Sequence, residues 1–82
     1  MSRARDVVEV IAKALVDHPE SVQVEERVDR GGVRIELTTR AGDLGKLIGR
    51  RGRTASAVRA LADIAAERDG LRAAVDFLDG EE

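Results

Sequence analysis

Residues 44–55 read LGKLIGRRGRTA, and the central GRRG decides how this part of the chain folds. Apolar residues precede the two glycines at helical spacing, and a longer helical pattern follows them. Gly49 and Gly52 lack side chains and tolerate positive φ, so they are suited to a tight turn. We therefore predict a short helix at 44–48 and a longer helix at about 53–68, joined by this turn.

The ends of both helices carry the residues that helix ends favour. Asp43 immediately precedes the short helix and is placed to cap it. Gly70 follows the longer helix and provides its C-terminal stop. The longer helix is expected to bury one apolar face, which consists of Val58, Leu61, Ala62 and Ala65.

The first part of the chain predicts another amphipathic helix, at residues 3–16. Ser2 is placed to cap it, and His18 with Pro19 ends it. Its apolar residues recur at spacings of three and four, which makes one stripe for the core. That stripe consists of Val7, Val8, Ile11, Ala14 and Leu15.

Residues 21–28 and 33–38 alternate apolar and polar side chains, as strands with one buried face do. The turn-forming residues at 29–32 lie between them, so the two strands predict a β-hairpin. Glu26 interrupts the apolar face of the first strand, which indicates either a bulge or an exposed strand end. A third alternating stretch at 71–77 predicts the last strand.

The predicted order is α-β-β-α-α-β, in one α+β domain at residues 1–79 followed by a polar tail at 80–82. Two helices connect the second and third strands, and such a crossover favours a parallel pair. We expect a three-stranded mixed sheet with three helices on one face. The opposite face is expected to carry Gln23, Glu25, Arg34, Glu36 and Arg72.

Charge is unevenly distributed along the chain. Residues 40–59 hold six basic residues and a single acid, so they carry +5 while the rest of the chain carries −7. A basic window in an acidic protein indicates either a site for a polyanion or a solvated arginine-rich face. The whole-chain net charge of −2 conceals this asymmetry.

Several classes of function are disfavoured by residue types. There is no cysteine, and the single His18 cannot anchor a zinc site, so we expect no metal and no cofactor. Lys46 follows Gly45 without the glycine spacing or the Ser/Thr of a P-loop. His18 falls at a helix end without a neighbour that would form a triad with Ser56. We expect no enzyme, and a cytoplasmic protein without a membrane span.

The turn has the residue types of a nucleic-acid clamp. A phosphodiester backbone can approach the glycines closely, and N–H groups at the start of the following helix favour an anion. Guanidinium groups suit phosphate geometry, so we expect Arg50 and Arg51 to neutralise phosphates. Lys46, Arg53 and Arg59 extend the basic track. An apolar groove for bases is expected from Leu47, Ile48 and Val58.

A hydrophobic residue followed by Gly-x-x-Gly, set between helices in this element order, resembles a type II KH domain. More narrowly, residues 45–59 resemble the small bacterial proteins of the KhpA family, and the likeness extends over essentially the whole chain. It implies that residues 49–52 clamp about four nucleotides of single-stranded RNA. It also implies a post-transcriptional regulator or RNA chaperone. The partner that it implies is a second KH-domain protein (KhpB, also called Jag). Independently of the resemblance, part of the first helix could be a dimer surface with another copy of the chain, since a small core benefits from a partner. Ala55 stands where the broad KH pattern has a large aliphatic residue. This difference is expected to affect base selectivity more than the grip on the backbone.

A second function remains open, in which the KH fold is a protein-interaction or dimerisation scaffold, for example in ribosome assembly, and a partner supplies the RNA contact. The lack of Trp and Tyr excludes an exposed aromatic platform, because Phe77 is the single ring and falls on a strand. Three phosphate contacts predict a log–log salt slope of about −2 for a single strand. Residue types do not separate RNA from single-stranded DNA.

Overall fold

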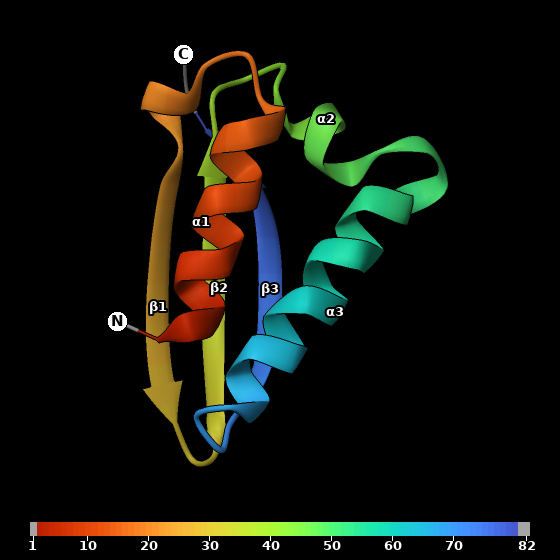
Figure 1. Cartoon of the computed structure of the whole chain (residues 1–82). Coiled ribbons are helices and arrows are strands. Elements are labelled where there is room, and N and C mark those ends of the chain that lie inside the picture. The colour runs from red at the N-terminus through yellow and green to blue at the C-terminus, as the bar shows by residue number, and fades with distance from the viewer. Residues whose placement is uncertain (1, 81–82) are drawn as a thin grey trace.

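The computed structural model describes residues 2–80. Its element order is the predicted one, with two additional 3-10 turns (Figure 1). The elements are α1 (Arg3–Leu15), η1 (Pro19–Ser21), β1 (Gln23–Asp29), β2 (Gly32–Thr39), α2 (Leu44–Ile48), η2 (Arg50–Gly52), α3 (Arg53–Glu67) and β3 (Arg72–Asp79). No helix among the described residues is long and apolar enough to cross a bilayer.

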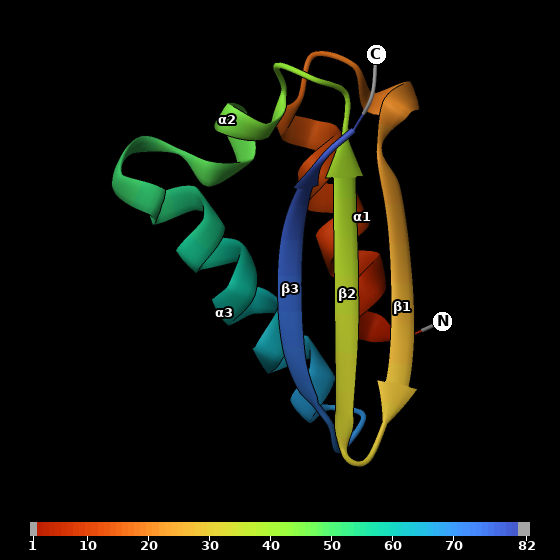
Figure 2. The ribbon, with the colours of Figure 1, turned by 180° about the vertical axis from the view of Figure 1, so that it is seen from behind.

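The three strands form one mixed sheet in the order β1-β2-β3, which confirms the prediction (Figure 2). β1 pairs antiparallel with β2 through a hairpin, and β2 pairs parallel with β3. Ile35 of β2 lies opposite Glu26 on one side and Val75 on the other. The crossover from β2 to β3 consists of α2, the glycine turn and α3, so the turn is part of the connection that makes the pair parallel.

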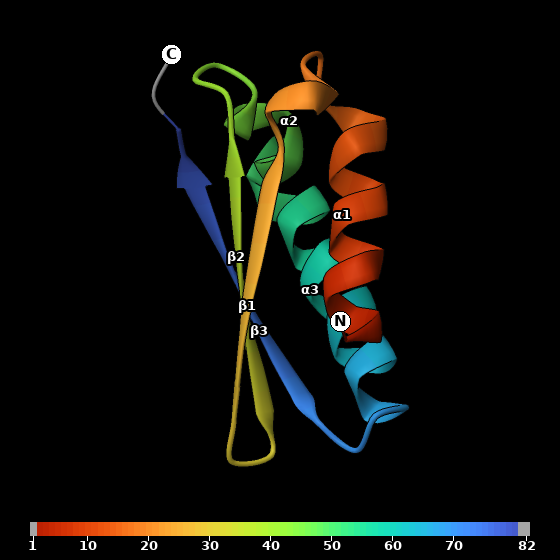
Figure 3. The same ribbon diagram turned by 90° about the vertical axis from the view of Figure 1, so that its left-hand side faces the viewer.

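All the helices lie on one face of the sheet, as predicted, and no element within residues 2–80 covers the other face (Figure 3). Four of the five side chains expected on that open face are exposed, and Glu36 is half-buried. On this face Arg27 lies opposite Arg34, and Glu25 lies opposite Glu36. Arg34 offsets part of the resulting repulsion through an ion pair with Asp76 at 2.8 Å.

The core lies between the helices and the sheet, and the helices contribute mostly small residues to it. α1 buries Ala4, Val8 and Ala12, which recur every four residues. α3 buries Ala55, Val58, Ala62 and Ala66. Small side chains let helix and sheet backbones approach closely, while β2 supplies the bulk with Val33, Ile35 and Leu37.

The predicted core faces of both helices were partly wrong. Ala14 and Leu15 of α1 are exposed, and so is Leu61 of α3. In each helix the buried stripe lies one position from the exposed residues, has the same period and is rich in alanine: it holds Ala4 and Ala12 in α1 and Ala62 and Ala66 in α3. Periodicity does not choose between two adjacent stripes, and the close approach of the layers favours the smaller one.

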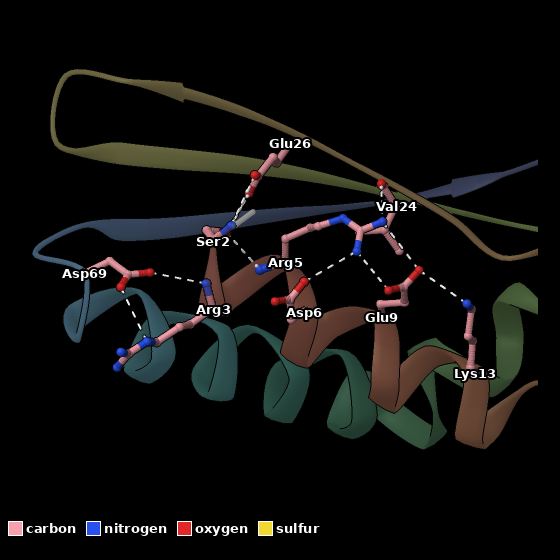
Figure 4. Close-up of polar contacts among 9 residues, drawn as sticks. All are labelled: Ser2, Arg3, Arg5, Asp6, Glu9, Lys13, Val24, Glu26 and Asp69. Carbon is pink, nitrogen blue, oxygen red and sulfur yellow. Dashed lines mark hydrogen bonds and ion pairs between the residues drawn. The ribbon is translucent and has the colours of Figure 1, made fainter.

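Glu26 does not produce a bulge, because the β1–β2 register runs unbroken from Gln23 to Asp29. The strand end is exposed, with Val28 open to solvent, which confirms the second of the two expectations. Glu26 itself is half-buried against the start of α1. Its carboxylate accepts the Ser2 hydroxyl at 2.6 Å and the Ser2 backbone N–H at 3.2 Å (Figure 4).

Ser2 caps α1 as predicted, with its hydroxyl oxygen accepting the N–H of Arg5 at 3.1 Å. Arg5 then joins α1 to β1, since it donates to the Glu9 carboxylate at 2.8 Å and to the carbonyl of Val24 at 3.2 Å (Figure 4). Hydrogen bonds from Arg5 and then from Lys13 hold the pKa of Glu9 below its ordinary value.

The predicted polar tail at 80–82 reaches beyond the described residues. Its first residue, Gly80, donates its backbone N–H to the carbonyl of Thr39 at 2.7 Å.

Candidate nucleic-acid interface

The Gly49-Arg50-Arg51-Gly52 turn joins α2 to α3 on the side of the molecule away from β1 (Figure 1). Gly49 ends α2 with φ 75° and ψ 173°, a conformation that glycine alone adopts without strain. Its N–H donates to the Gly45 carbonyl at 2.9 Å, and its own carbonyl accepts the N–H of Gly52 at 3.1 Å. The predicted turn between two helices is therefore present at the predicted residues.

The two glycines are required for different reasons. A Cβ on Gly49 would collide with the hydroxyl of Thr54 and would lie 2.8 Å from its Cβ, so the protein itself fills the space beside Gly49. Gly52 also has positive φ, at 73°, but a Cβ there would meet no atom within 4 Å. The space beside Gly52 is open, and a ligand backbone can approach the main chain there.

Arg51 has φ 58° and ψ 24°, and it is the single non-glycine residue with positive φ in the described part of the chain. The left-handed conformation costs about 1 kcal/mol or more for a residue with a Cβ. Such strain is concentrated at functional sites, where it sets the direction of a side chain. Here it belongs to one of the two arginines predicted to meet phosphate.

The predicted basic residues divide into two groups. Arg50, Arg51 and Arg53 are exposed and have no ion-pair partner among residues 2–80. Lys46 and Arg59 are also exposed, but each has a protein partner. The Nζ of Lys46 lies 3.2 Å from the carboxylate of Asp17, while Arg59 contacts β3. Three free guanidinium groups therefore gather at the turn and at the start of α3.

The predicted base-contacting residues are not all at the surface. Leu47 and Val58 are fully buried in the core, with exposed fractions of 0% and 2%. Ile48 is half-buried and adjoins Gly49. Leu47 and Val58 thus anchor α2 and α3 in the core. Of the three residues, only Ile48 has solvent-accessible surface that a base could contact.

Asp43 occupies the predicted N-cap position of α2, but its side chain makes no capping bond. Instead its carboxylate accepts the backbone N–H of His18 at 3.0 Å and pairs with His18 Nδ1 at 3.1 Å. Burial of the Asp43 carboxyl favours its neutral form, but the hydrogen bonds from His18 outweigh burial and hold the pKa of Asp43 below its ordinary value.

The sequence does not predict this pair, because His18 and Asp43 are 25 residues apart and no local pattern links them. Together with the Asp17–Lys46 ion pair it ties α2 to the connection between α1 and β1. Asp43 lies at the N-cap of α2 and Lys46 in its last turn, so the two ties hold both ends of the short helix that leads into the glycine turn. The buried Asp43–His18 pair therefore helps fix where the turn and its arginines are held, while the exposed Asp17–Lys46 pair contributes little. No group of three or more potential metal ligands comes together within residues 2–80.

The start of α3 adds backbone donors to this surface. Gly52, which has no side chain to donate or accept a capping bond, occupies its N-cap position. The N–H of Arg53 donates to the carbonyl of Arg50, while the N–H groups that follow it in the first turn of this 15-residue helix, and the helix dipole, favour an anion at this end. Backbone donors, open space at Gly52 and three free guanidinium groups thus meet at one site.

The family described as KhpA/KhpB, KH domain matches residues 5–77. The protein named RNA-binding protein KhpA from Halalkalibacterium halodurans is 44% identical over 75 residues, covering 92% of this chain and 99% of that protein. Its namesake from Aquifex aeolicus is 38% identical over 79 residues, covering 96% of this chain and all of that protein. A crystal structure of Aquifex aeolicus Era bound to GDP and aluminium fluoride superposes with a TM-score of 0.68 at 18% identity. That match covers 96% of this chain but 30% of Era, and it is a likeness of fold alone.

Proposed function

The chain belongs to the KhpA/KhpB family of KH domains, and on that basis we propose that it is a non-catalytic single-stranded RNA-binding protein. In this proposal residues 1–79 act as a single KH domain in the bacterial cytoplasm. The role is that of a post-transcriptional regulator or RNA chaperone, which grips the RNA backbone with the Gly49–Gly52 turn.

The observation that carries the proposal is the contrast between the two sides of the turn. Gly49 is packed against Thr54, whereas Gly52 faces open space beside two exposed arginines. A turn that served only to connect helices would not need a strained Arg51 next to an open glycine. A ligand backbone that enters beside Gly52 meets Arg50, Arg51 and the N–H groups of α3 together.

The remaining predicted residues take roles that follow from their positions. Arg53 neutralises a further phosphate at the start of α3. Lys46 reaches phosphate by leaving Asp17, because an exposed ion pair contributes little free energy. Ile48 contacts a base, while the buried Leu47 and Val58 position the two helices.

The experiment is a fluorescence anisotropy titration of seven-nucleotide RNA and DNA across a salt series. We expect wild-type binding to weaken with salt at a log–log slope of about −2. The double variant Arg50→Asp, Arg51→Asp should fold, as circular dichroism would check, and should not bind. Retained RNA affinity in the folded double variant would refute the role of the turn, and a preference for RNA over DNA would identify the ligand class.

A second function, as a protein-interaction surface, is favoured by the outer face of the helix layer. Val10 of α1 and Ile64 of α3 are 70% and 58% exposed, and Leu61 lies one turn before Ile64. A hollow of about 370 Å³ between the two helices adjoins Val7 and Ala65. Exposed apolar side chains of this kind suit a second KH domain, from a partner protein or from another copy of the chain.

Light scattering after size-exclusion chromatography tests this second function. The double variant Val10→Ser, Ile64→Ser should reduce self-association without changing the melting temperature. Val28→Ser is the matched control, because Val28 at 59% is about as exposed as Ile64 but lies near the end of β1. An equal effect of the control would mean that association is not specific to the helix layer. A pull-down of a second KH protein with and without ribonuclease would separate direct contact from RNA bridging.

A further inference from the structure

Arg59 of α3 has surroundings unlike those of the arginines at the turn. Its Cζ lies 4.9 Å from the centroid of the Phe77 ring on β3. Its Nε donates to the carbonyl of Val75, also on β3, at 3.4 Å. The guanidinium group therefore covers the single aromatic ring of the protein.

The guanidinium of Arg59 remains available to a ligand. The bond to Val75 is long for an N–H···O hydrogen bond, and the residue is exposed. No carboxylate pairs with Arg59 among the described residues, whereas Arg5 is held by Glu9 and Arg34 by Asp76. Arg59 thus presents a flat, charged surface with free N–H donors, backed by a ring.

The distance from the turn suits a nucleotide held by it. Arg59 follows Gly52 by seven residues, which is about 10 Å along the helix axis. A KH turn holds about four nucleotides, so a bound strand can reach this far. One turn beyond, the Asp63 carboxylate accepts the N–H of Ala73 on β3 at 3.1 Å. The negative charge of Asp63 disfavours a phosphate beside it. A strand that runs from the turn along α3 reaches Arg59 first, and Asp63 discourages it from going further.

Resting on the proposed function, we propose that Arg59, backed by Phe77, reads a base of the bound strand rather than a phosphate. The Phe77 ring holds one face of the guanidinium, and the guanidinium fork donates N–H groups in its own plane to two adjacent acceptors on the edge of a base. Guanine offers O6 and N7, and cytosine offers O2 and N3. Adenine and uracil have no adjacent pair of acceptors. Arg59 therefore selects guanine or cytosine at one position.

The test uses seven-nucleotide oligouridine and versions whose central base is replaced by guanine, cytosine or adenine. We expect wild-type protein to bind the guanine or cytosine oligomer about fivefold more tightly than the adenine one, as for a modest bidentate contact. Arg59→Lys keeps the charge but has no fork, so the preference should fall to about one while the salt slope stays unchanged. Arg53→Lys is the matched control and should keep the preference.

A second variant, Phe77→Leu, keeps an apolar side chain on β3 but removes the ring, and it should weaken the preference at an unchanged salt slope. Melting curves check that each variant is folded. Equal wild-type binding of the four oligomers, or a preference that survives Arg59→Lys, would overturn the role of Arg59 and leave RNA binding standing. No binding to any oligomer would overturn the proposed function itself.

Discussion

One carboxylate oxygen of Asp43 receives both the backbone N–H of His18 at 3.0 Å and the ring Nδ1 of His18 at 3.1 Å. Asp43 has an exposed fraction of 3%. The pair joins the segment before α2 to the segment after α1, which are 25 residues apart in sequence. It therefore couples the position of the glycine turn to the first helix of the fold.

Asp43→Ala should lower the melting temperature and weaken RNA binding, because it leaves the His18 N–H without its acceptor and frees the start of α2. Thermal denaturation and anisotropy titration measure the two effects. Asp17→Ala is the matched control, since it breaks the exposed ion pair to Lys46 in the same region. Such a pair contributes about 0–1 kcal/mol, so the control should melt close to wild type. Equal destabilisation by both variants would contradict the importance of the Asp43–His18 pair.

Gly49→Ala and Gly52→Ala should differ in what they lose. Both place a Cβ at positive φ, which costs about 1–2 kcal/mol. Gly49→Ala also forces a collision with Thr54. Urea denaturation should therefore show a larger loss in free energy of unfolding for Gly49→Ala than for Gly52→Ala. Gly52→Ala should lose only the cost of positive φ, keep the native fold and weaken RNA binding, because its Cβ enters the open space. Unchanged RNA affinity of Gly52→Ala would show that the ligand does not approach there.

Arg51→Gly should stabilise the protein while it weakens binding. Glycine relieves the strain at φ 58°, for a gain of about 0.5–1 kcal/mol in free energy of unfolding. The lost charge should make the salt slope shallower by about 0.7. Arg50→Gly is the control, since Arg50 has no positive φ and glycine there should destabilise. Chemical denaturation and a salt series measure both variants, and destabilisation by Arg51→Gly would argue against stored strain.

Acid should reduce stability through two carboxyl groups. The pKa values of Glu9 and Asp43 are lowered in the folded protein, so their contribution is fully present above their ordinary values of 4.5 and 3.8. It is lost as the pH falls through the lower folded-state values. The urea midpoint should therefore drop between pH 5 and pH 2, and less so in Glu9→Gln. Glu20→Gln, which removes an exposed carboxylate without an ion pair in the described part of the chain, should follow wild type.

The sequence predicted what depends on local pattern. Alternation of apolar residues predicted the hairpin and β3, and the glycines at 49 and 52 predicted the turn between two helices. The crossover rule then predicted the parallel pair. These features can be predicted from residues that are close in sequence, or from a general rule for how chains connect strands.

The features that were missed depend on residues far apart in sequence. The Asp43–His18 pair and the contact of Arg59 with Phe77 each join two elements, and no spacing rule links them. The exposure of Leu61 and the burial of Leu47 follow from how closely the layers approach. Residue types predicted a basic surface around the turn, and tertiary packing decided which side chains reach that surface.

The crossover through α2, the turn and α3 has a consequence for how the protein folds. β3 pairs with β2 across the whole of segment 40–71, whereas β1 pairs with β2 through the two residues between them. Distant pairings form slowly, because the intervening chain loses entropy before the contact is made. We expect the hairpin to form early and β3 to dock late, once the strained turn has closed. Selection for a ligand-gripping turn would then also set the folding rate, and pulsed hydrogen exchange would detect β3 as the last strand protected.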